Sequence, residues 1–386
     1  MSLVRFCRLH WLSSLLLAVL CGCSVVPVNT EVKPQSIQPA PVDKPATGLL
    51  AFNQQLEYEL NSEPLSSLQQ RVDVLSIARN LRIKFPQQFF NPLNTAKVAA
   101  DLKQQLVSGM VEMSQAFQWH YLHSKTFSNG DIAAYYRLDS DDGYTYITLW
   151  LEPENYQIYD LHSVSYTFST LDFVGQFTLL FSQYGSTHPK LSELIKSLQN
   201  KQIEVSLALY NGLDEQVRRN PALTDFLLRL YSQVSSDNTL QIQNMLVTAL
   251  TQVGKHSLLF ESGFIQQDNF VEAIKIVQSL PLFALQDAKM QSELAILHAY
   301  NREYDAAIRH GRQAILAEPN VQEAYFVMLQ VSFLARDYAL SVDLINVLMA
   351  KFALAMEPRV LAEFEESDGF INSGEYQSWL NQQIKS

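Results

Sequence analysis

This chain of 386 residues has only three cysteines, Cys7, Cys21 and Cys23, and all lie within its first 23 positions. The rest of the chain therefore has no disulfide and no thiol chemistry, and its stability must come from its core. Positive charge is also scarce, with 28 Lys+Arg against 39 Asp+Glu and a net charge of -11. Because phosphate backbones favour clustered positive charge, this balance excludes nucleic acid as a partner.

Sequence motifs of enzyme active sites are missing as well. The chain has no GxSxG, HExxH, paired CxxC, GxGxxG or complete P-loop motif. Residues 254–257 match only the tail of a P-loop and lack its upstream glycine. The sequence therefore predicts a protein that is not an enzyme and that uses no cofactor and no metal.

Three short patterns are weak candidates for chemistry. His120 and His123 have the spacing of metal ligands on a helix, but no carboxylate is indicated beside them, so packing histidines are the simpler interpretation. The acids within 139–143 suggest part of a calcium loop, but their alternation is wrong and a hairpin turn explains them better. Asp160 and His162 could form an acid and base pair on one strand face, but no nucleophile accompanies them.

What the chain does have begins with a secretory signal. An apolar run at 11–20 follows two arginines, and it is too short to span a membrane. The sequence LCGC at 20–23 resembles the lipobox of bacterial lipoproteins, in which cleavage precedes a cysteine that receives lipid on its sulfur. The resemblance implies removal of residues 1–22, lipidation of Cys23 and, because Ser24 follows, an outer-membrane anchor with the body in the periplasm. An ordinary signal peptide with incidental cysteines is the alternative.

The next segment, 23–47, is rich in proline and poor in large apolar residues. It cannot build a core, so we expect an extended tether. At about 3.1 Å per residue it reaches roughly 70 Å. The folded part can then work well away from the membrane.

Residues 48–185 predict an α+β domain. Apolar residues at helical spacing alternate with β-like runs that are joined by short turns, which favours a three-stranded antiparallel meander with helices on one face. Nuclear-transport-factor-like and cystatin-like topologies both fit. The many aromatic residues here could line a small-molecule or glycan pocket, or they could form core and sheet surface. We expect helices at 65–81, 94–121 and 171–184, and strands at 132–138, 144–151 and 156–168.

The C-terminal half changes to helical periods, and a 34-residue repeat becomes visible when the chain is laid against itself. Three sets of residues align at this spacing: Phe270, Tyr304 and Tyr338; Ala273, Ala307 and Ser341; and Ile274, Ile308 and Val342.

The clearest unit, 291–319, resembles the tetratricopeptide repeat. Gln291, His298 and Gly311 depart from the residues usual in that family. The resemblance implies helical hairpins stacked into a solenoid at 254–353, with degenerate hairpins at 186–253 and a helical cap at 354–386. The matching positions are Leu294, Ala295, Ala307, Ala314 and Pro319.

Stacked hairpins present a concave face lined by their first helices, and such a face suits protein binding. We therefore predict a non-enzymatic scaffold, anchored by lipid and binding periplasmic or envelope proteins. The α+β domain or a second copy could fill the groove instead. Other readings are a ligand-binding or sensory α+β domain with the repeats as its output arm, or a hydrolase. The predicted groove residues are Lys255, Leu258, Ser262, Gln266, Lys289, Ser292, Ile296, Tyr300, Glu323, Phe326, Gln330 and Phe333.

Overall fold

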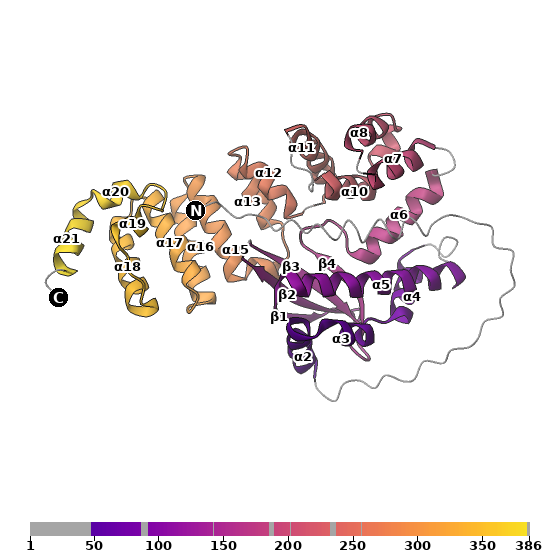
Figure 1. Cartoon of the computed structure of the whole chain (residues 1–386), viewed down its shortest axis with the longest axis horizontal. Coiled ribbons are helices and arrows are strands. Elements are labelled where there is room, and N and C mark those ends of the chain that lie inside the picture. The colour runs from indigo at the N-terminus through magenta and orange to yellow at the C-terminus, as the bar shows by residue number, and fades with distance from the viewer. Residues whose placement is uncertain are drawn as a thin grey trace. The chain divides into compact units, whose positions relative to one another are not determined.

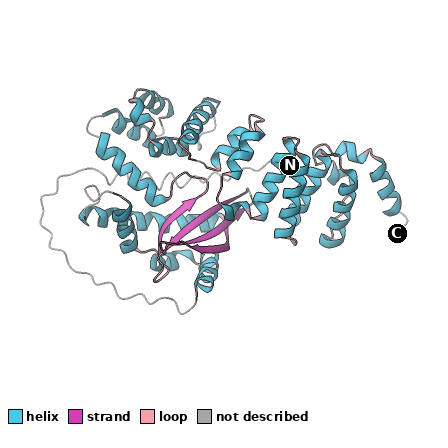
Figure 2. Ribbon diagram, turned by 180° about the vertical axis from the view of Figure 1, so that it is seen from behind, coloured by secondary structure: helices cyan, strands magenta, loops and turns pink. Residues whose placement is uncertain are grey.

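The structure is a computed structural model and describes residues 48–85, 92–141, 143–184, 189–200, 202–231, 237–255 and 257–383. The predicted signal peptide, Cys23 and the tether lie outside the described residues. The described chain is mostly helical with one antiparallel sheet (Figures 1 and 2). Within it, no helix has the length and apolarity needed to cross a membrane.

Contacts divide the chain into two compact units, with the boundary after Lys255. We call them the N-terminal unit, ending at 255, and the C-terminal unit, which begins at 256. The N-terminal unit contains the sheet, whose strand order is β1-β2-β3-β4. Its elements up to the last strand are α2 (Leu49–Ser62), α3 (Pro64–Arg71), α4 (Val74–Lys84), α5 (Pro92–Ala116), β1 (Gln118–Thr126), β2 (Ile132–Ser140), β3 (Gly143–Leu151) and β4 (Ile158–Ser163).

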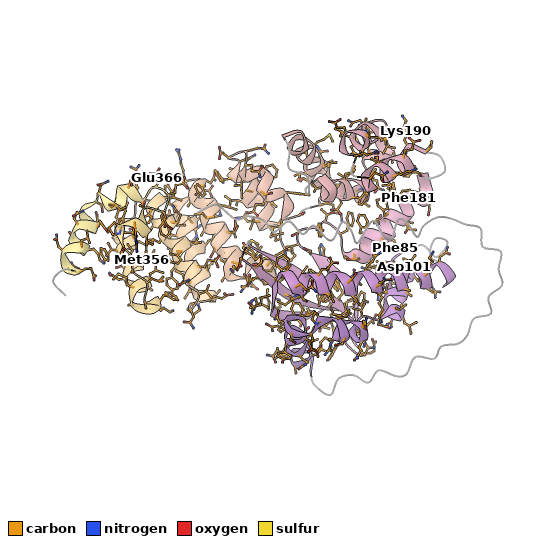
Figure 3. All side chains as sticks on the ribbon, in the orientation of Figure 1. Phe85, Asp101, Phe181, Lys190, Met356 and Glu366 are labelled. Atoms are coloured by element: carbon orange, nitrogen blue, oxygen red, sulfur yellow. The ribbon has the colours of Figure 1, made fainter. Side chains whose placement is uncertain are left out.

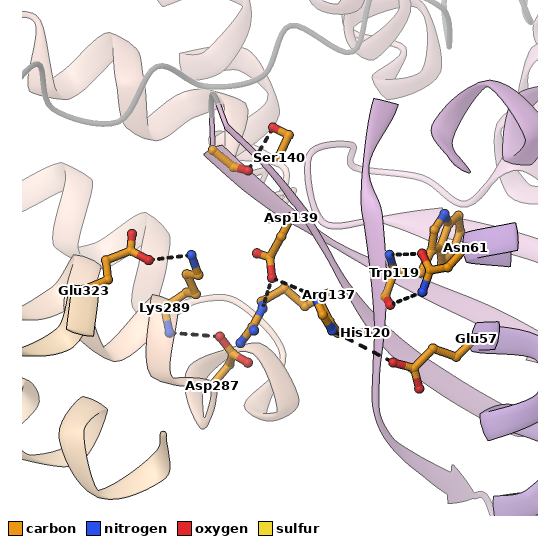
Figure 4. Close-up of polar contacts among 11 residues, drawn as sticks. Glu57, Asn61, Trp119, His120, Arg137, Asp139, Ser140, Asp287, Lys289 and Glu323 are labelled. Atoms are coloured by element: carbon orange, nitrogen blue, oxygen red, sulfur yellow. Dashed lines mark hydrogen bonds and ion pairs between the residues drawn. The ribbon is translucent and has the colours of Figure 1, made fainter. Parts of the chain in front are cut away.

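The sheet has four strands: the three expected strands are present as β2, β3 and β4, and β1 is a fourth strand that was not predicted. The predicted helix at 94–121 ends at Ala116, and β1 begins two residues later. Trp119 explains the change, because its ring is fully buried and its backbone is held by the Asn61 side chain. The Asn61 amide donates to the Trp119 carbonyl and the Trp119 N–H donates to Asn61 Oδ1, both at 2.8 Å (Figure 4).

The predicted helix at 65–81 is broken in two. Val72 leaves the helix to form a parallel bridge with Ile158 of β4. Asp73 then restarts the helix as the cap of α4, with its carboxylate accepting from the Ser76 N–H at 2.8 Å. The apolar period continues through the break, which is why the sequence alone reads as one helix.

After the sheet, α6 (Thr170–Tyr184) matches the helix expected at 171–184. Two helical hairpins follow it within the N-terminal unit. The Phe226 ring of the second hairpin packs against Phe173 and Phe177 of α6, with ring centroids 6.2 and 5.2 Å apart. The second hairpin therefore shares a core with α6. Their elements are α7 (Pro189–Gln199), α8 (Ile203–Asn211), α9 (Glu215–Arg218), α10 (Pro221–Tyr231) and α11 (Asp237–Gln252).

The C-terminal unit is a succession of helical hairpins closed by short helices. The second helices of three hairpins begin at Phe270, Tyr304 and Tyr338, which are the aligned residues of the sequence repeat. The described elements are α12 (Leu259–Ile265), α13 (Phe270–Gln278), α14 (Leu282–Leu285), α15 (Ala288–Tyr300), α16 (Tyr304–Ala317), α17 (Gln322–Leu334), α18 (Tyr338–Phe352), α19 (Pro358–Leu361), α20 (Ser367–Ile371) and α21 (Gly374–Gln383).

The backbone repeats with the same period. Asp268, Arg302 and Arg336 adopt positive φ angles of 53°, 62° and 56° at the turns between the paired helices. A left-handed conformation is costly for a residue with a side chain, so its recurrence at equivalent positions marks a common turn. At each turn the following N–H bonds back five residues: Asn269 to Phe264 O at 2.9 Å, Glu303 to His298 O at 2.8 Å, and Asp337 to Ser332 O at 2.9 Å.

Small residues let the hairpins pack closely. Ala273, Ala307 and Ser341 are all fully buried at the same position of their repeats. Gly311 of α16 lies so close to Met328 of α17 that a methyl group on Gly311 would collide with the Met328 sulfur. The departure at Gly311 is therefore matched by a long side chain opposite it.

Candidate functional site

The first helices of neighbouring hairpins are aligned in register. Lys289 of α15 and Glu323 of α17 are 34 residues apart, and Lys289 Nζ lies 2.6 Å from Glu323 Oε2 (Figure 4). The Lys289 N–H also donates to the capping carboxylate of Asp287 at 2.9 Å. Equivalent positions of two repeats therefore meet on one surface.

This surface continues along α15. Ser292 and Ile296 follow Lys289 at helical spacing and are half-buried, while Glu323 is more exposed. We call Lys289, Ser292, Ile296 and Glu323 the open face. It combines one apolar side chain with hydroxyl and charged groups.

The C-terminal ends of the same helices are covered by the chain itself. The Tyr300 hydroxyl donates to the Glu365 carboxylate. Gln330 Nε2 donates to the Glu365 carbonyl at 2.8 Å, and the Glu365 N–H donates to Gln330 Oε1 at 3.1 Å. The Phe326 ring lies 6.0 Å from the Phe364 ring. We call residues 361–371 the C-terminal segment; Figure 3 labels Glu366, which lies within it.

Three predicted groove residues do not belong to the accessible surface of the C-terminal unit. Phe333 is fully buried, with its ring 5.7 Å from Phe364 and 5.1 Å from Phe370. Leu258 is 2% exposed and precedes α12, because the first helix of that hairpin starts late. Lys255 lies in the N-terminal unit, where its Nζ stands 4.5 Å over the Phe168 ring. Ser262 of α12 is half-buried, and Gln266 just after α12 is exposed.

A buried pair of acids is the feature that sequence reasoning missed. Glu261 of α12 is fully buried, and Glu293 of α15 is 5% exposed. Burial raises the pKa of Glu261 well above its usual value, and the neighbouring Glu293 carboxyl raises it further. Glu261 precedes Ala295 by one 34-residue period, and a glutamate at the position of that small residue is the signal that could have revealed the pair.

Two histidines stack where α15 meets α16. The rings of His298 and His310 are 5.1 Å apart and nearly parallel. His298 Nδ1 pairs with Glu303 and His310 Nδ1 pairs with Gln291 Oε1 at 2.7 Å. Burial lowers the pKa of His310, and the nearby His298 lowers it further. Among the described residues, no group of three His, Cys, Asp or Glu side chains is arranged to hold a metal ion.

The histidines of the HxxH pattern lie on β1 rather than on a helix. His120 Nε2 is 3.3 Å from Asp139 Oδ2, and its Nδ1 is 3.9 Å from Glu57 (Figure 4). The His123 ring packs 4.9 Å from the Tyr135 ring. The two imidazoles thus have separate partners.

The other weak candidates are structural. Ser140 pairs with Gly143 at the end of a hairpin, so the acidic stretch is a turn, although Asp142 lies outside the described residues. Asp160 is fully buried and its Oδ1 accepts from the N–H groups of Leu161 at 2.8 Å and Leu171 at 2.9 Å. Burial raises the pKa of Asp160 to about 6. His162 Nε2 bonds the Tyr166 carbonyl at 3.0 Å.

The N-terminal unit has a polar pocket of about 780 Å³ between α2, α3 and the β3–β4 connection. Arg71 crosses it, donating from Nε and Nη2 to both oxygens of Glu59 at 2.8 Å and lying 4.7 Å over the Phe52 ring. Burial raises the pKa of Glu59, but hydrogen bonds from Arg71, Ser67 and Gln55 outweigh it and lower the pKa to about 2. The lining residues are Phe52, Tyr58, Glu59, Ser62, Glu63, Ser66, Ser67, Gln70, Arg71, Asn155 and Gln157.

Comparison of the chain with protein families, with curated proteins and with solved structures finds no match in any of the three.

Proposed function

We propose that this protein is a non-enzymatic scaffold whose C-terminal unit is a tetratricopeptide-like solenoid that binds partner proteins on its open face. The observation that carries the proposal is the contact of Lys289 with Glu323 at the same position of successive repeats. It supports a continuous surface made by α15 and α17, and a preformed surface loses little conformational entropy when a partner docks.

The composition of the open face also favours a protein partner. Ile296 offers a half-buried apolar contact, and Ser292, Lys289 and Glu323 surround it with groups that hydrogen-bond or pair with charge. An apolar contact inside a polar rim is the usual plan of a protein interface.

We further propose that the scaffold works in the periplasm, held at the outer membrane by lipid on Cys23. The support is the lipobox resemblance at 20–23 and the proline-rich segment after it. Two or more acyl chains would make the anchor stable, because each buried CH₂ contributes about 0.8 kcal/mol.

Photo-crosslinking in cells tests the open face. A photoreactive amino acid at position 296 should capture a small, reproducible set of envelope proteins. The matched control is position 316 on α16, where Leu316 is 79% exposed and away from the first helices. Capture of the same proteins at both positions would contradict the proposal that the open face binds partners.

The pocket beside Arg71 favours a second candidate function, a small-molecule or glycan-binding N-terminal unit. Its volume of about 780 Å³ suits a sugar or a metabolite, and serines, amides and one ion pair offer hydrogen bonds. A thermal-shift screen with cell-wall fragments tests it, since a ligand at 100 times its Kd adds about 2.7 kcal/mol of stability. A Ser66→Trp variant, which fills the pocket, should lose any shift.

A further inference from the structure

The C-terminal segment is bound to the repeats in the manner of a peptide ligand. Gln330 uses both atoms of its side-chain amide to pair with the N–H and the carbonyl of one residue, Glu365, at 3.1 and 2.8 Å. Both hydrogen bonds are to the main chain of Glu365, so they do not depend on the side chain at that position. Glu365 lies in the turn between α19 and α20, so another segment that forms the same turn can satisfy the contact.

Two side chains of the segment add specificity. The Phe364 ring lies between Phe326 and Phe333, at 6.0 and 5.7 Å. The Glu365 carboxylate accepts from the hydroxyl of Tyr300, whose ring stacks 5.3 Å from Phe270. The site therefore selects an aromatic residue followed by an acidic one.

A cap for the last hairpin does not need these polar contacts. Leu361, Phe370, Tyr376 and Trp379, together with Phe364 itself, form a buried apolar cover at the end of the unit, and the polar contacts of Glu365 are additional to it. Glu365 reaches beyond that cover to Tyr300 on α15, which belongs to the preceding hairpin. The contact thus bridges two first helices, as a bound partner would.

The segment is also held under conditions that favour release. Glu366, directly after the bound residue, has a φ of 60°, a left-handed conformation that costs roughly 1–2 kcal/mol for a residue with a side chain. Four acids crowd within 363–368 and repel one another.

We propose that α15 and α17 form a peptide-binding site for a turn of a partner protein in which an aromatic residue is followed by an acidic residue, and that Phe364 and Glu365 occupy this site until such a turn displaces them. The proposal rests on the proposed function and names the chemistry of the partner. Tyr300, Phe326 and Gln330 are the residues that would contact the partner segment.

Fluorescence anisotropy with the full chain tests this proposal. The probe is a labelled peptide with the sequence of residues 361–368, LAEFEESD. A Phe364→Ala, Glu365→Ala variant empties the site and should bind the peptide at least tenfold more tightly than the unaltered chain. Adding Gln330→Ala to that variant should reverse the gain, and a peptide with alanine in place of phenylalanine should not bind.

A single substitution keeps the test valid if the double variant does not fold. Glu365→Ala removes only the exposed carboxylate and its hydrogen bond to Tyr300, while Glu363→Ala, which alters an exposed acid two residues away, is the matched control. Hydrogen exchange over 361–371 should quicken in Glu365→Ala and in the unaltered chain when peptide is added, but not in Glu363→Ala alone.

Three results would overturn the proposal: no peptide binding by the released variant, unchanged exchange of the segment with peptide, or dimerisation of the released variant in place of peptide binding, which would make a second copy the occupant. Each leaves the capture at position 296 untouched. Failure of that capture, with peptide binding intact, would instead contradict the proposed use of the open face.

Discussion

Lys289 and Glu323 form an ion pair with a nitrogen–oxygen distance of 2.6 Å although 34 residues separate them, because they hold the same position in successive hairpins. An exposed pair of this kind contributes at most about 1 kcal/mol to stability. Its value is geometric, since it fixes the register of α15 against α17 and places their side chains on one surface.

The buried carboxyl of Glu261 makes the C-terminal unit sensitive to pH. Burial, and then the charge of Glu293, raises the pKa of Glu261, so the folded state binds its proton more tightly than the unfolded state. The stability that this proton supports is complete below the usual pKa of 4.5 and is lost as pH rises through the raised value. Glu261→Gln should therefore be more stable than the unaltered chain at pH 8, by about 1–3 kcal/mol.

Hydrogen exchange of α12 and α15 at pH 5 and pH 8 measures this effect. Glu272→Gln, at a partly exposed acid on α13, is the control and should change little. Faster exchange in Glu261→Gln than in the unaltered chain at pH 8 would contradict the prediction, because it would show that the charged carboxylate stabilises the fold.

The contact of Gly311 with Met328 predicts the cost of a larger side chain. Gly311→Leu places a branched side chain where the Met328 sulfur lies, and overpacking of this kind costs about 1–3 kcal/mol. Combining it with Met328→Ala should restore part of the loss, because the second change opens the space that the first one needs. Thermal unfolding followed by hydrogen exchange of α16 and α17 reports both; equal loss in the single and double variants would place the strain elsewhere.

Arg71 and Glu59 predict the opposite dependence on pH in the N-terminal unit. The pKa of Glu59 is lowered to about 2, so the stability from this pair is present above its usual pKa of 4.5 and is lost as pH falls from there towards 2. Arg71→Met should cost about 1 kcal/mol at pH 7 after allowance for solvent screening. The difference between the variant and the unaltered chain should disappear near pH 2; a constant difference from pH 7 to pH 2 would rule out the ion pair as its source.

Cys23 is the residue on which the proposed location depends. Cys23→Ala should remove the site of acylation and move the chain from the membrane fraction to the soluble fraction. Fractionation of cells with an antibody to the chain measures this. The control is Cys21→Ala, which leaves Cys23 in place and should stay with the membrane.

The helical character of the C-terminal part was predictable because its signal is local and recurrent. Phe270, Tyr304 and Tyr338 begin equivalent helices, and small residues at 273, 307 and 341 are buried against neighbouring helices, as a 34-residue period implies. Such positions are read from spacing without knowledge of distant contacts.

Features set by contacts between distant residues were not predictable. The apolar spacing of the preceding helix continues into β1. The residues form a strand because they pair with β2 and because Asn61 bonds the Trp119 backbone. The covering of Tyr300 by Glu365 joins residues 65 positions apart in a part of the chain that has no repeat pattern. Phe333 was wrongly predicted to line the groove because the sequence of its own helix does not show that Phe364 and Phe370 pack against it.

Chemical crosslinking of Lys289 to Glu323 tests most directly whether the first helices form one surface. A carbodiimide joins an amine to a carboxylate only where the two are in contact, and Lys84 with Asp172, 3.1 Å apart in the N-terminal unit, serves as the reference pair. We expect mass spectrometry of the treated full chain to detect both crosslinked peptides, and Glu323→Gln to remove the first alone. Recovery of the Lys84–Asp172 product without any Lys289–Glu323 product would contradict the register of the hairpins and the binding face built on it.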